Sequence, residues 1–197
     1  MSTDGTASYR GITNLPPRVA AAVEQARALG FENSSRPAHG RLLATLAGGV
    51  GAGAIGETGT GCGVGLAWMT TAAAPGACLV SVEAHARRAE AAREVLADDP
   101  RVTILTGDWS ELAGHGPFDL LVLDGGGKRG EPKADPEAWL RPGGVLVLDD
   151  FTPSTEWPRR YAGAVDKTRM HWLTHPSLLA AEIRTDPDAV CVLAVRR

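Results

Sequence analysis

A glycine-rich stretch, residues 54–67, contains the residue types and spacing that could do chemistry most directly. In it Glu57 is followed by four glycines at every second position, from Gly59 to Gly65. Glycines at this spacing let the backbone turn sharply and approach a ligand that side chains would exclude. The apolar run after them has helical spacing, so the glycines lie between a strand end and a helix start, where free N–H groups and the helix dipole attract anions. The stretch predicts a nucleotide-type ligand site.

Spacing separates this stretch from two other glycine-rich ligand loops. A dinucleotide fingerprint needs the pattern G-x-G-x-x-G, and neither Gly59 nor Gly61 is followed by a third glycine at the required position. A phosphate-binding P-loop needs Gly-Lys-Ser/Thr, whereas the Gly-Lys pair at 127–128 is followed by Arg129. An ordinary tight turn between a strand and a helix is the remaining alternative.

Apolar runs that read as strands alternate with helical segments along the rest of the chain. Near-continuous apolar strands separated by helices indicate a parallel sheet that is covered on both faces. A polar turn near the carboxyl end joins two further strands into an antiparallel hairpin. We also expect a helix after Pro158 that runs to Trp172. The expected strands are one that ends at Glu57 and those at residues 78–83, 102–105, 118–124, 144–149, 178–185 and 189–197.

Acidic and aromatic residues follow these strands at the edge where ligands bind in open α/β sheets. Glu83 ends the second strand, where a carboxylate can accept hydrogen bonds from both hydroxyls of a ribose. Asp108 follows the third strand and could accept a hydrogen bond from an adenine amino group, while Trp109 could stack on the ring. The alternatives are a helix-capping acid at Glu83 and a surface turn at Asp108.

Together these motifs resemble those of class I S-adenosylmethionine-dependent methyltransferases, and the resemblance covers residues 38 to 197. The acid-led glycine loop is similar to the first motif of that family, and Glu83, Asp108, Asp124 and residues 140–149 follow in its order and spacing. The resemblance implies S-adenosyl-L-methionine as the cofactor. The residues that it assigns to cofactor binding are Glu57, Gly59, Thr60, Gly61, Gly63, Glu83, Ala84, Asp108, Trp109 and Asp124.

Within that class the chain looks most like the small O-methyltransferases of the catechol and caffeoyl-CoA type. The resemblance implies a divalent metal held by Asp124 at the end of the fourth strand and by Asp149 and Asp150 at the end of the fifth. Two departures stand out. Asp150 replaces the family's asparagine, and the segment 124–128 is one residue longer than the family's pattern and lacks its second aspartate.

The three aspartates would repel one another unless a positive charge lies among them. Oxygen-only ligands suit Mg²⁺, Mn²⁺ or Ca²⁺ rather than zinc. Such a metal would lower the pKa of an acceptor hydroxyl and orient it toward the methyl group. The alternatives are that Lys128 or an amine of the substrate supplies the charge, or that some of the acids face solvent.

Asp149 and Lys128 are the predicted catalytic residues. Without metal, the base would be Lys128, Asp149 or His171. We expect His171 in a core or surface position, and His39 in a segment that skirts the active site in the resembling family. Three tryptophans, at positions 139, 157 and 172, could line a substrate pocket, but burial in the core is the expected role for each of them.

The predicted fold is a doubly wound, Rossmann-like α/β domain. It has a seven-stranded, mostly parallel sheet with a C-terminal antiparallel hairpin and helices on both faces. Residues 17–197 form this single domain, and residues 1–16 form a flexible N-terminal segment, because they are polar and aperiodic. We expect this segment and the loop 151–158 to close over the ligand face and exclude water.

Composition narrows the location and the partners. The 197 residues, 44% of them hydrophobic, suffice for one core. A net charge of -3 offers no broad basic surface, so we expect no nucleic-acid partner. The three cysteines are widely spaced, which suggests reduced thiols and a cytoplasmic location. No apolar run reaches the ~20 residues that span a bilayer, so we expect no membrane partner.

The predicted function is methyl transfer from S-adenosylmethionine to a small-molecule acceptor, at a hydroxyl and with a divalent metal as a candidate assistant. This displacement needs no enzyme nucleophile, which agrees with the lack of a Ser-His-Asp or Cys-His arrangement. The alternative is an inactive protein of the same fold that binds the cofactor or a partner. An aminopropyl transferase would need extra N-terminal strands, for which the first 50 residues give no signal. The sequence leaves a homodimer open.

Overall fold

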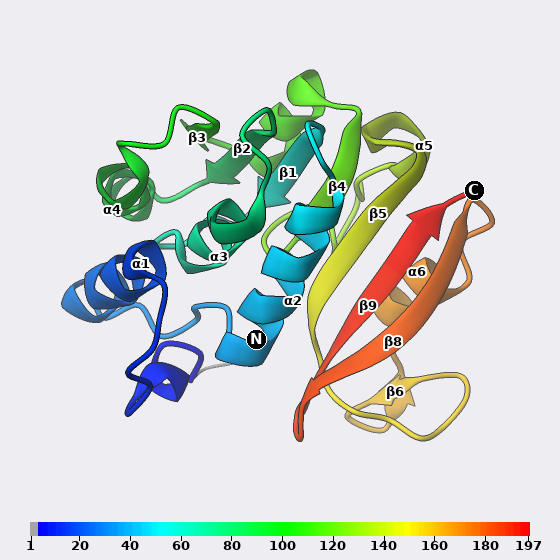
Figure 1. Cartoon of the computed structure of the whole chain (residues 1–197). Helices are drawn as coiled ribbons and strands as arrows, with labels where there is room; N and C mark the ends of the chain where they lie inside the picture. Colours follow the sequence, from blue (N-terminus) through cyan, green and yellow to red (C-terminus); the bar gives the residue numbers. More distant parts are fainter. Residues whose placement is uncertain (1–3) are drawn as a thin grey trace.

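A seven-stranded sheet with the strand order β3-β2-β1-β4-β5-β9-β8 forms the centre of the computed structural model, which describes residues 4–197 (Figure 1). The first five strands pair in parallel, and the last two add an antiparallel hairpin. The predicted fold is therefore confirmed. The strands are β1 (Ala54–Thr58), β2 (Cys78–Glu83), β3 (Val102–Thr106), β4 (Phe118–Leu123), β5 (Leu140–Phe151), β8 (Leu178–Asp186) and β9 (Ala189–Arg196).

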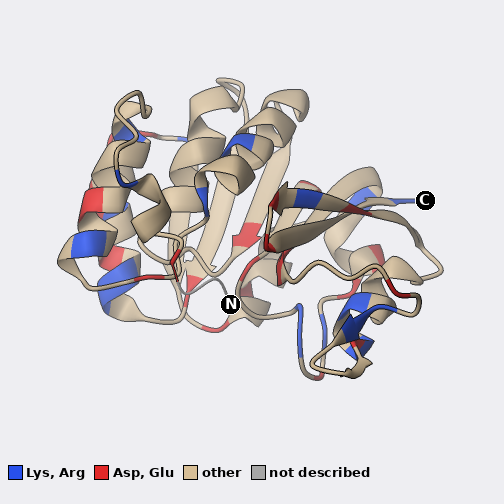
Figure 2. Ribbon diagram, turned by 90° about the horizontal axis from the view of Figure 1, so that it is seen from below, with Lys and Arg blue, Asp and Glu red and all other residues tan. Residues whose placement is uncertain are grey.

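The direction of the chain through the sheet reverses between β1 and β4. From β1 the chain runs outward through β2 to β3, and it then returns to add β4 on the other side of β1. Ligands of open α/β sheets bind at such a reversal, outside the carboxyl ends of the strands. In Figure 2, which views the molecule from below, red acidic segments lie near the middle of the molecule, one of them at the end of a strand.

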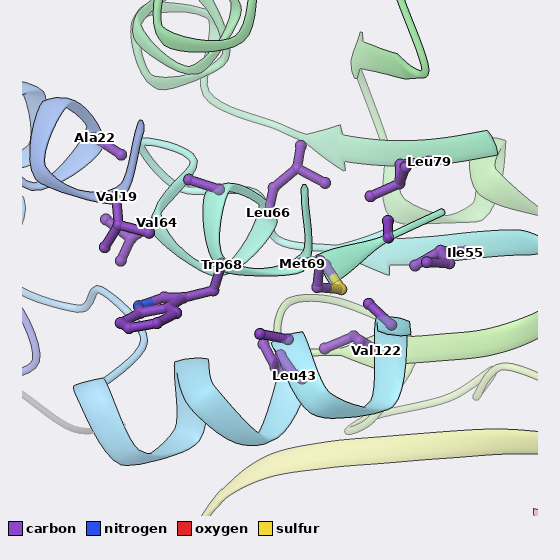
Figure 3. Packing of buried hydrophobic residues seen from close by; sticks show 14 of the residues in the cluster. Val19, Ala22, Leu43, Ile55, Val64, Leu66, Trp68, Met69, Leu79 and Val122 are labelled. Carbon is purple, nitrogen blue, oxygen red and sulfur yellow. The ribbon is translucent and has the colours of Figure 1, made fainter. Parts of the chain in front are cut away.

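Helices cover both faces of the sheet because the strands are apolar on both faces. Leu120 and Val122 of β4 belong to one buried cluster, and Leu121 and Leu123 belong to the other. Figure 3 shows the first cluster, where Leu43, Leu66 and neighbours pack on β1, β2 and β4. One face carries α1 (Pro17–Ala28), α2 (Pro37–Gly49), α3 (Val64–Ala72) and α4 (Ala86–Leu96), and the other carries η2 (Trp109–His115), α5 (Pro136–Trp139) and α6 (Lys167–Leu173).

None of these helices, within residues 4–197, is both long enough and apolar enough to cross a membrane.

The segment predicted to be flexible, residues 1–16, is packed against the domain over much of its described part. Residues 1–3 lie outside the described residues, and η1 (Ala7–Tyr9) ends in a buried tyrosine. The Tyr9 hydroxyl donates to the Ser35 carbonyl oxygen (2.8 Å) and accepts from the Trp68 indole nitrogen (2.9 Å). The structure differs here from the sequence expectation because the buried Tyr9 side chain, which donates one hydrogen bond and accepts another, anchors the segment. The segment has no periodic pattern of apolar residues from which this packing could be predicted.

The predicted helix from Pro158 to Trp172 is wrong in its first half. A small antiparallel hairpin occupies that part, with a left-handed turn at Ala162 (φ 49°) and Gly163 (φ 80°). The helix α6 starts later, where the Asp166 side chain accepts a hydrogen bond from the Arg169 backbone N–H (3.0 Å). The hairpin strands are β6 (Arg160–Tyr161) and β7 (Ala164–Val165).

Two glycines of α2 test the close contact between α2 and α3. A Cβ atom at Gly40 would lie 2.2 Å from Trp68 Cδ1, whereas a Cβ at Gly49 would meet nothing within 4 Å. We expect Gly40→Ala to lower the free energy of unfolding by about 1–3 kcal/mol through overpacking. Gly49→Ala should change it by less than about 1 kcal/mol, in the stabilising direction. Urea unfolding of both variants measures this, and equal losses would contradict the α2–α3 contact.

Candidate active site

Two cavities meet at the carboxyl edge of the sheet. The glycine-loop cavity has a volume of about 240 Å³ and lies over the turn after β1 and the end of β2. The acidic cavity has a volume of about 220 Å³ and lies over the end of β5 and the β8–β9 turn. Asn33, Asp124 and Asp150 line both of them. A ligand in one cavity would therefore face a ligand in the other across these three side chains.

Backbone contact between the loops after β1 and β4 shapes the floor of this region. Gly59 has a φ of +86°, and a Cβ atom on it would lie 2.6 Å from the backbone nitrogen of Gly125. The carbonyl oxygen of Thr58 accepts hydrogen bonds from the backbone N–H groups of Asp124 (3.1 Å) and Gly125 (2.7 Å). Any side chain at Gly59 would push these loops apart, so the glycine is required for the approach.

Glu83, the last residue of β2, is buried and lines the glycine-loop cavity. Its Oε2 accepts a hydrogen bond from the Gly61 backbone N–H (2.8 Å), and its Oε1 accepts one from the His85 backbone N–H (2.9 Å). The carboxylate thus braces the glycine loop and the turn into α4. Its position beside the cavity is the one that the ribose prediction requires.

Asp108 and Trp109 form another wall of the glycine-loop cavity. The Asp108 carboxylate caps η2 by accepting a hydrogen bond from the Ser110 backbone N–H (3.0 Å), and its hydrogen bonds to the Ser110 side chain and backbone lower its pKa. Asp108 therefore lies both in a turn that caps η2 and in the wall of the cavity. The Trp109 ring lies against Gly126 and 5.6 Å from the Trp139 ring.

Glu57 lies on β1 beside a narrow extension of the glycine-loop cavity, which Ser34 and Ser35 also line. Its carboxylate accepts a hydrogen bond from the Ser81 hydroxyl (2.6 Å). Burial raises the pKa of Glu57 to about 7, against the lowering effect of the Ser81 hydrogen bond, and the Glu83 charge raises it further. A cationic group of a ligand in this extension would stabilise the ionised form.

Asp124, Asp149 and Asp150 converge at the junction of the two cavities, each with one carboxylate oxygen within 4.8 Å of the others. Consecutive residues of a regular strand point to opposite faces. Here the register of β5 against β9 shifts between Leu148 and Phe151, and Asp150 has a φ of 68°. The bulge and the left-handed residue let two consecutive carboxylates reach the same point.

The buried ammonium group of Lys128 opposes this negative charge. Lys128 Nζ donates to the Asp149 carbonyl oxygen (2.8 Å) and lies 3.7 Å from Asp150 Oδ2. Burial raises the pKa of Asp124 well above its usual range, the charge of Lys128 lowers it, and the charges of Asp149, Asp150 and Glu57 raise it. The Arg129 guanidinium also donates to the Asp150 carbonyl oxygen (3.0 Å), so two basic side chains contact the end of β5.

The three aspartates fit a hard divalent cation. Their donor atoms are all oxygens, which suits Mg²⁺, Mn²⁺ or Ca²⁺, and they offer more negative charge than Lys128 balances. Aspartate tolerates the left-handed backbone at position 150 about as well as asparagine does. The exchange of the family's asparagine for Asp150 therefore leaves the backbone geometry of the cluster intact.

All predicted cofactor residues except Gly63 line the glycine-loop cavity or its narrow extension. Gly63 instead begins α3, and a Cβ there would press on Ala92 of α4 at 3.0 Å. Thr60 is buried, and its hydroxyl pairs with the Ser81 hydroxyl (2.5 Å). Lys128 is buried behind the aspartates and belongs to the lining of neither cavity.

The segment 31–36 is the part of the site that the sequence motifs missed. Phe31 lies against Gly61, under the guanidinium of Arg88 (4.9 Å from its ring centroid), and both line the glycine-loop cavity. Ser34 and Ser35 line the acidic cavity and the narrow extension. The only sequence signal was a lone aromatic residue directly after the Gly30 helix end.

The histidines and tryptophans that the sequence offered as candidate base or pocket residues differ in their positions. His171 is exposed on α6 beside His175, away from the lining of both cavities. Trp139 and Trp172 are buried as expected, but the core expectation is wrong for Trp157, which is 63% exposed on the loop before β6. His39, in contrast, is buried with its Nε2 3.5 Å from Asp149 Oδ2.

Comparison with known proteins agrees with this geometry. A family model described as a methyltransferase domain matches residues 57–151, which contain the glycine loop and the three clustered aspartates. No curated protein matches the chain.

Several solved structures share the whole fold. The cofactor-bound protein Rv0187 from MTB is 24% identical with a TM-score of 0.75, over 96% of this chain and 94% of that one. The O-methyltransferase TomG from Streptomyces achromogenes, in complex with SAM, is 20% identical with a TM-score of 0.73, over 98% and 95%. An O-methyltransferase from Bacillus cereus in complex with SAH is 17% identical with a TM-score of 0.73, over 98% and 96%.

A methyltransferase-domain model matches residues 57–151 and the solved structures share the fold, so both agree with the class I S-adenosylmethionine-dependent methyltransferase that the motifs predict. Within that class, its structural neighbours include proteins named as O-methyltransferases.

Glu57 should make the protein without ligand less stable as the pH rises. Its pKa of about 7 in the folded protein exceeds the ordinary value of 4.5, so the folded state binds this proton more tightly than the unfolded state. Stability is then lost between about pH 4.5 and about pH 7. Glu57→Gln should remove this loss, so its stability relative to wild type should grow across that range. Urea unfolding from pH 4 to pH 8 tests this, and a difference that is independent of pH would contradict it.

Proposed function

We propose that the protein transfers a methyl group from S-adenosylmethionine to an oxygen of a small-molecule acceptor. One observation carries the proposal: the glycine-loop cavity and the acidic cavity share Asp124 and Asp150, so a methyl donor and an acceptor can meet there. The volume of the acidic cavity, about 220 Å³, is below the usual range for drug-sized ligands and favours a small acceptor.

The cofactor would extend along the glycine-loop cavity. Glu83 would accept the ribose hydroxyls, and Asp108 and Trp109 would contact the adenine. The Glu57 carboxylate would pair with the amino group of the methionine part, and its raised pKa supports a cationic partner there. Asp124 lies where the cavities meet and would face the sulfonium end.

Methyl transfer needs the acceptor oxygen in line with the bond between carbon and sulfur, and it releases the acceptor proton. Asp149 lines the acidic cavity and would orient the acceptor hydroxyl and accept its hydrogen bond. Lys128 would balance the charge of Asp149 and Asp150 from behind, since it contacts both residues. Asp124, Asp149 and Asp150 would hold a divalent metal, which when bound lowers the pKa of the hydroxyl.

An inactive binding or partner protein is the second candidate. It is favoured by the Lys128 ammonium, which supplies a positive charge 3.7 Å from Asp150 Oδ2 without a metal, and by the altered 124–128 segment. Cofactor binding without any methyl transfer would support it. The cytoplasmic location and the homodimer stay predictions.

The cofactor assignment is tested at Glu83. Glu83→Ala should weaken the binding of S-adenosylhomocysteine by about 1.5–3 kcal/mol, because charged hydrogen bonds to the ribose are lost. Glu90→Ala, an exposed acid on α4, is the matched control and should bind as wild type does. Titration calorimetry measures both affinities. Undetectable binding to the wild type, or equal binding by Glu83→Ala, would refute the assignment.

The metal assignment is tested at Asp149. Chelator should abolish methyl transfer and Mg²⁺ or Mn²⁺ should restore it, because an oxygen-only site binds such ions. Asp149→Ala should lose Mn²⁺ binding, measured by electron paramagnetic resonance, while S-adenosylhomocysteine affinity stays within about threefold of wild type. Asp98→Ala, an exposed acid outside both cavities, serves as the control. Full activity in chelator, with no bound Mn²⁺, would show that no metal takes part.

A further inference from the structure

His39 is a buried side chain that finds no hydrogen-bond partner in the described part of the chain. It lies in the first turn of α2 with an exposure of 1%, and neither Nδ1 nor Nε2 has a hydrogen-bond partner among residues 4–197. Buried polar groups in native proteins are nearly always bonded, because an unmet donor or acceptor costs about 1–3 kcal/mol. A side chain that carries this cost at a cavity wall is a candidate for binding a ligand.

The imidazole belongs to the wall of the acidic cavity, where the acceptor would bind. Its Nε2 lies 3.5 Å from Asp149 Oδ2, so a ligand group beside Asp149 also lies beside His39. Polar side chains make up most of this wall, and Phe151 and Ala189 are its apolar members. The wall therefore offers hydrogen bonds rather than an apolar surface.

Packing around the start of α2 fixes the position of His39. The next residue, Gly40, lies directly against the Trp68 ring, and Tyr9 holds the Ser35 carbonyl. Arg36 bonds Asp188 in the β8–β9 turn (2.5 Å) and Asp4 in the N-terminal segment (2.7 Å). The ring is thus presented to the cavity by a rigid frame, as a binding residue requires.

We propose that His39 is an acceptor-binding and specificity-determining residue. It hydrogen-bonds a polar group next to the reacting oxygen, and the acceptor is accordingly a compact polar molecule rather than an extended apolar one. The inference rests on the proposed methyl transfer, since that function makes the acidic cavity the acceptor site. It adds two things to that function: the residue that recognises the acceptor, and the chemical class of the acceptor.

Three small probes test this with the protein loaded with S-adenosylhomocysteine and Mg²⁺. They are 3,4-dihydroxybenzamide, 4-hydroxybenzamide, which lacks the neighbouring hydroxyl, and 4-isopropylcatechol, which replaces the amide by an apolar group of similar shape. Calorimetry should show that the wild type binds the first probe at least about tenfold more tightly than either of the others, the discrimination that one added hydrogen-bonding group gives. Preference for 4-isopropylcatechol would overturn the polar class.

Two substitutions separate binding from a structural role. His39→Leu should shrink the preference for the second hydroxyl to about threefold or less, whereas His39→Gln, which keeps a donor and an acceptor, should retain most of it. Where the first probe is methylated, His39→Leu should raise its KM more than it lowers kcat. S-adenosylhomocysteine and Mn²⁺ affinities should stay unchanged in both variants.

Other outcomes would overturn the inference. An unchanged preference in His39→Leu would exclude His39 as the reader of the acceptor. Loss of Mn²⁺ binding in both variants, with S-adenosylhomocysteine binding kept, would mean that His39 only supports Asp149. If no probe binds, the proposed acceptor class is wrong, and intact S-adenosylhomocysteine binding by the same protein would show that the proposed cofactor site still stands.

Discussion

The close approach of the loops after β1 and β4 is the contact on which the rest of the site depends. Gly59 touches the Gly125 backbone, and the Thr58 carbonyl binds two N–H groups of the β4 loop. This contact lies where the chain direction reverses in the sheet, so it sets the floor between the two cavities. It also fixes Asp124, the first residue after β4, at their junction. A larger residue at position 59 would disturb all of these features together.

The distribution of charge at the junction of the two cavities follows from the position of these loops. The strand ends bring Asp124, Asp149 and Asp150 within 4.8 Å of one another, and Lys128 is the ammonium group that contacts the last two. The raised pKa of Asp124 is the result of burial among like charges. In the proposed complex, positive charge from the sulfonium and from a dication would enter this region. Charge complementarity would then favour the bound pair of substrates over either cavity alone.

The sequence predicted the parts of the site that follow from local rules. Apolar strands, a glycine loop and acids at strand ends placed Glu57, Glu83 and Asp124 correctly at the edge of the sheet. It could not predict the segment 31–36, because that wall comes from long-range packing on the glycine loop and leaves no periodic pattern. Nor did it indicate the left-handed backbone of Asp150, since a bulge depends on the partner strand.

The residues that lower the stability of the fold lie together at the carboxyl edge of the sheet. Glu57 is a buried carboxyl with a pKa of about 7, Asp150 holds a left-handed backbone, and His39 is buried with no hydrogen bond to any described residue. Away from the site, both faces of the sheet are packed with apolar side chains that offset such costs. Local rules are satisfied in the core and broken around the cavities, which is the pattern expected where ligands supply the missing partners. Binding of both substrates should therefore stabilise this edge more than any other part of the fold.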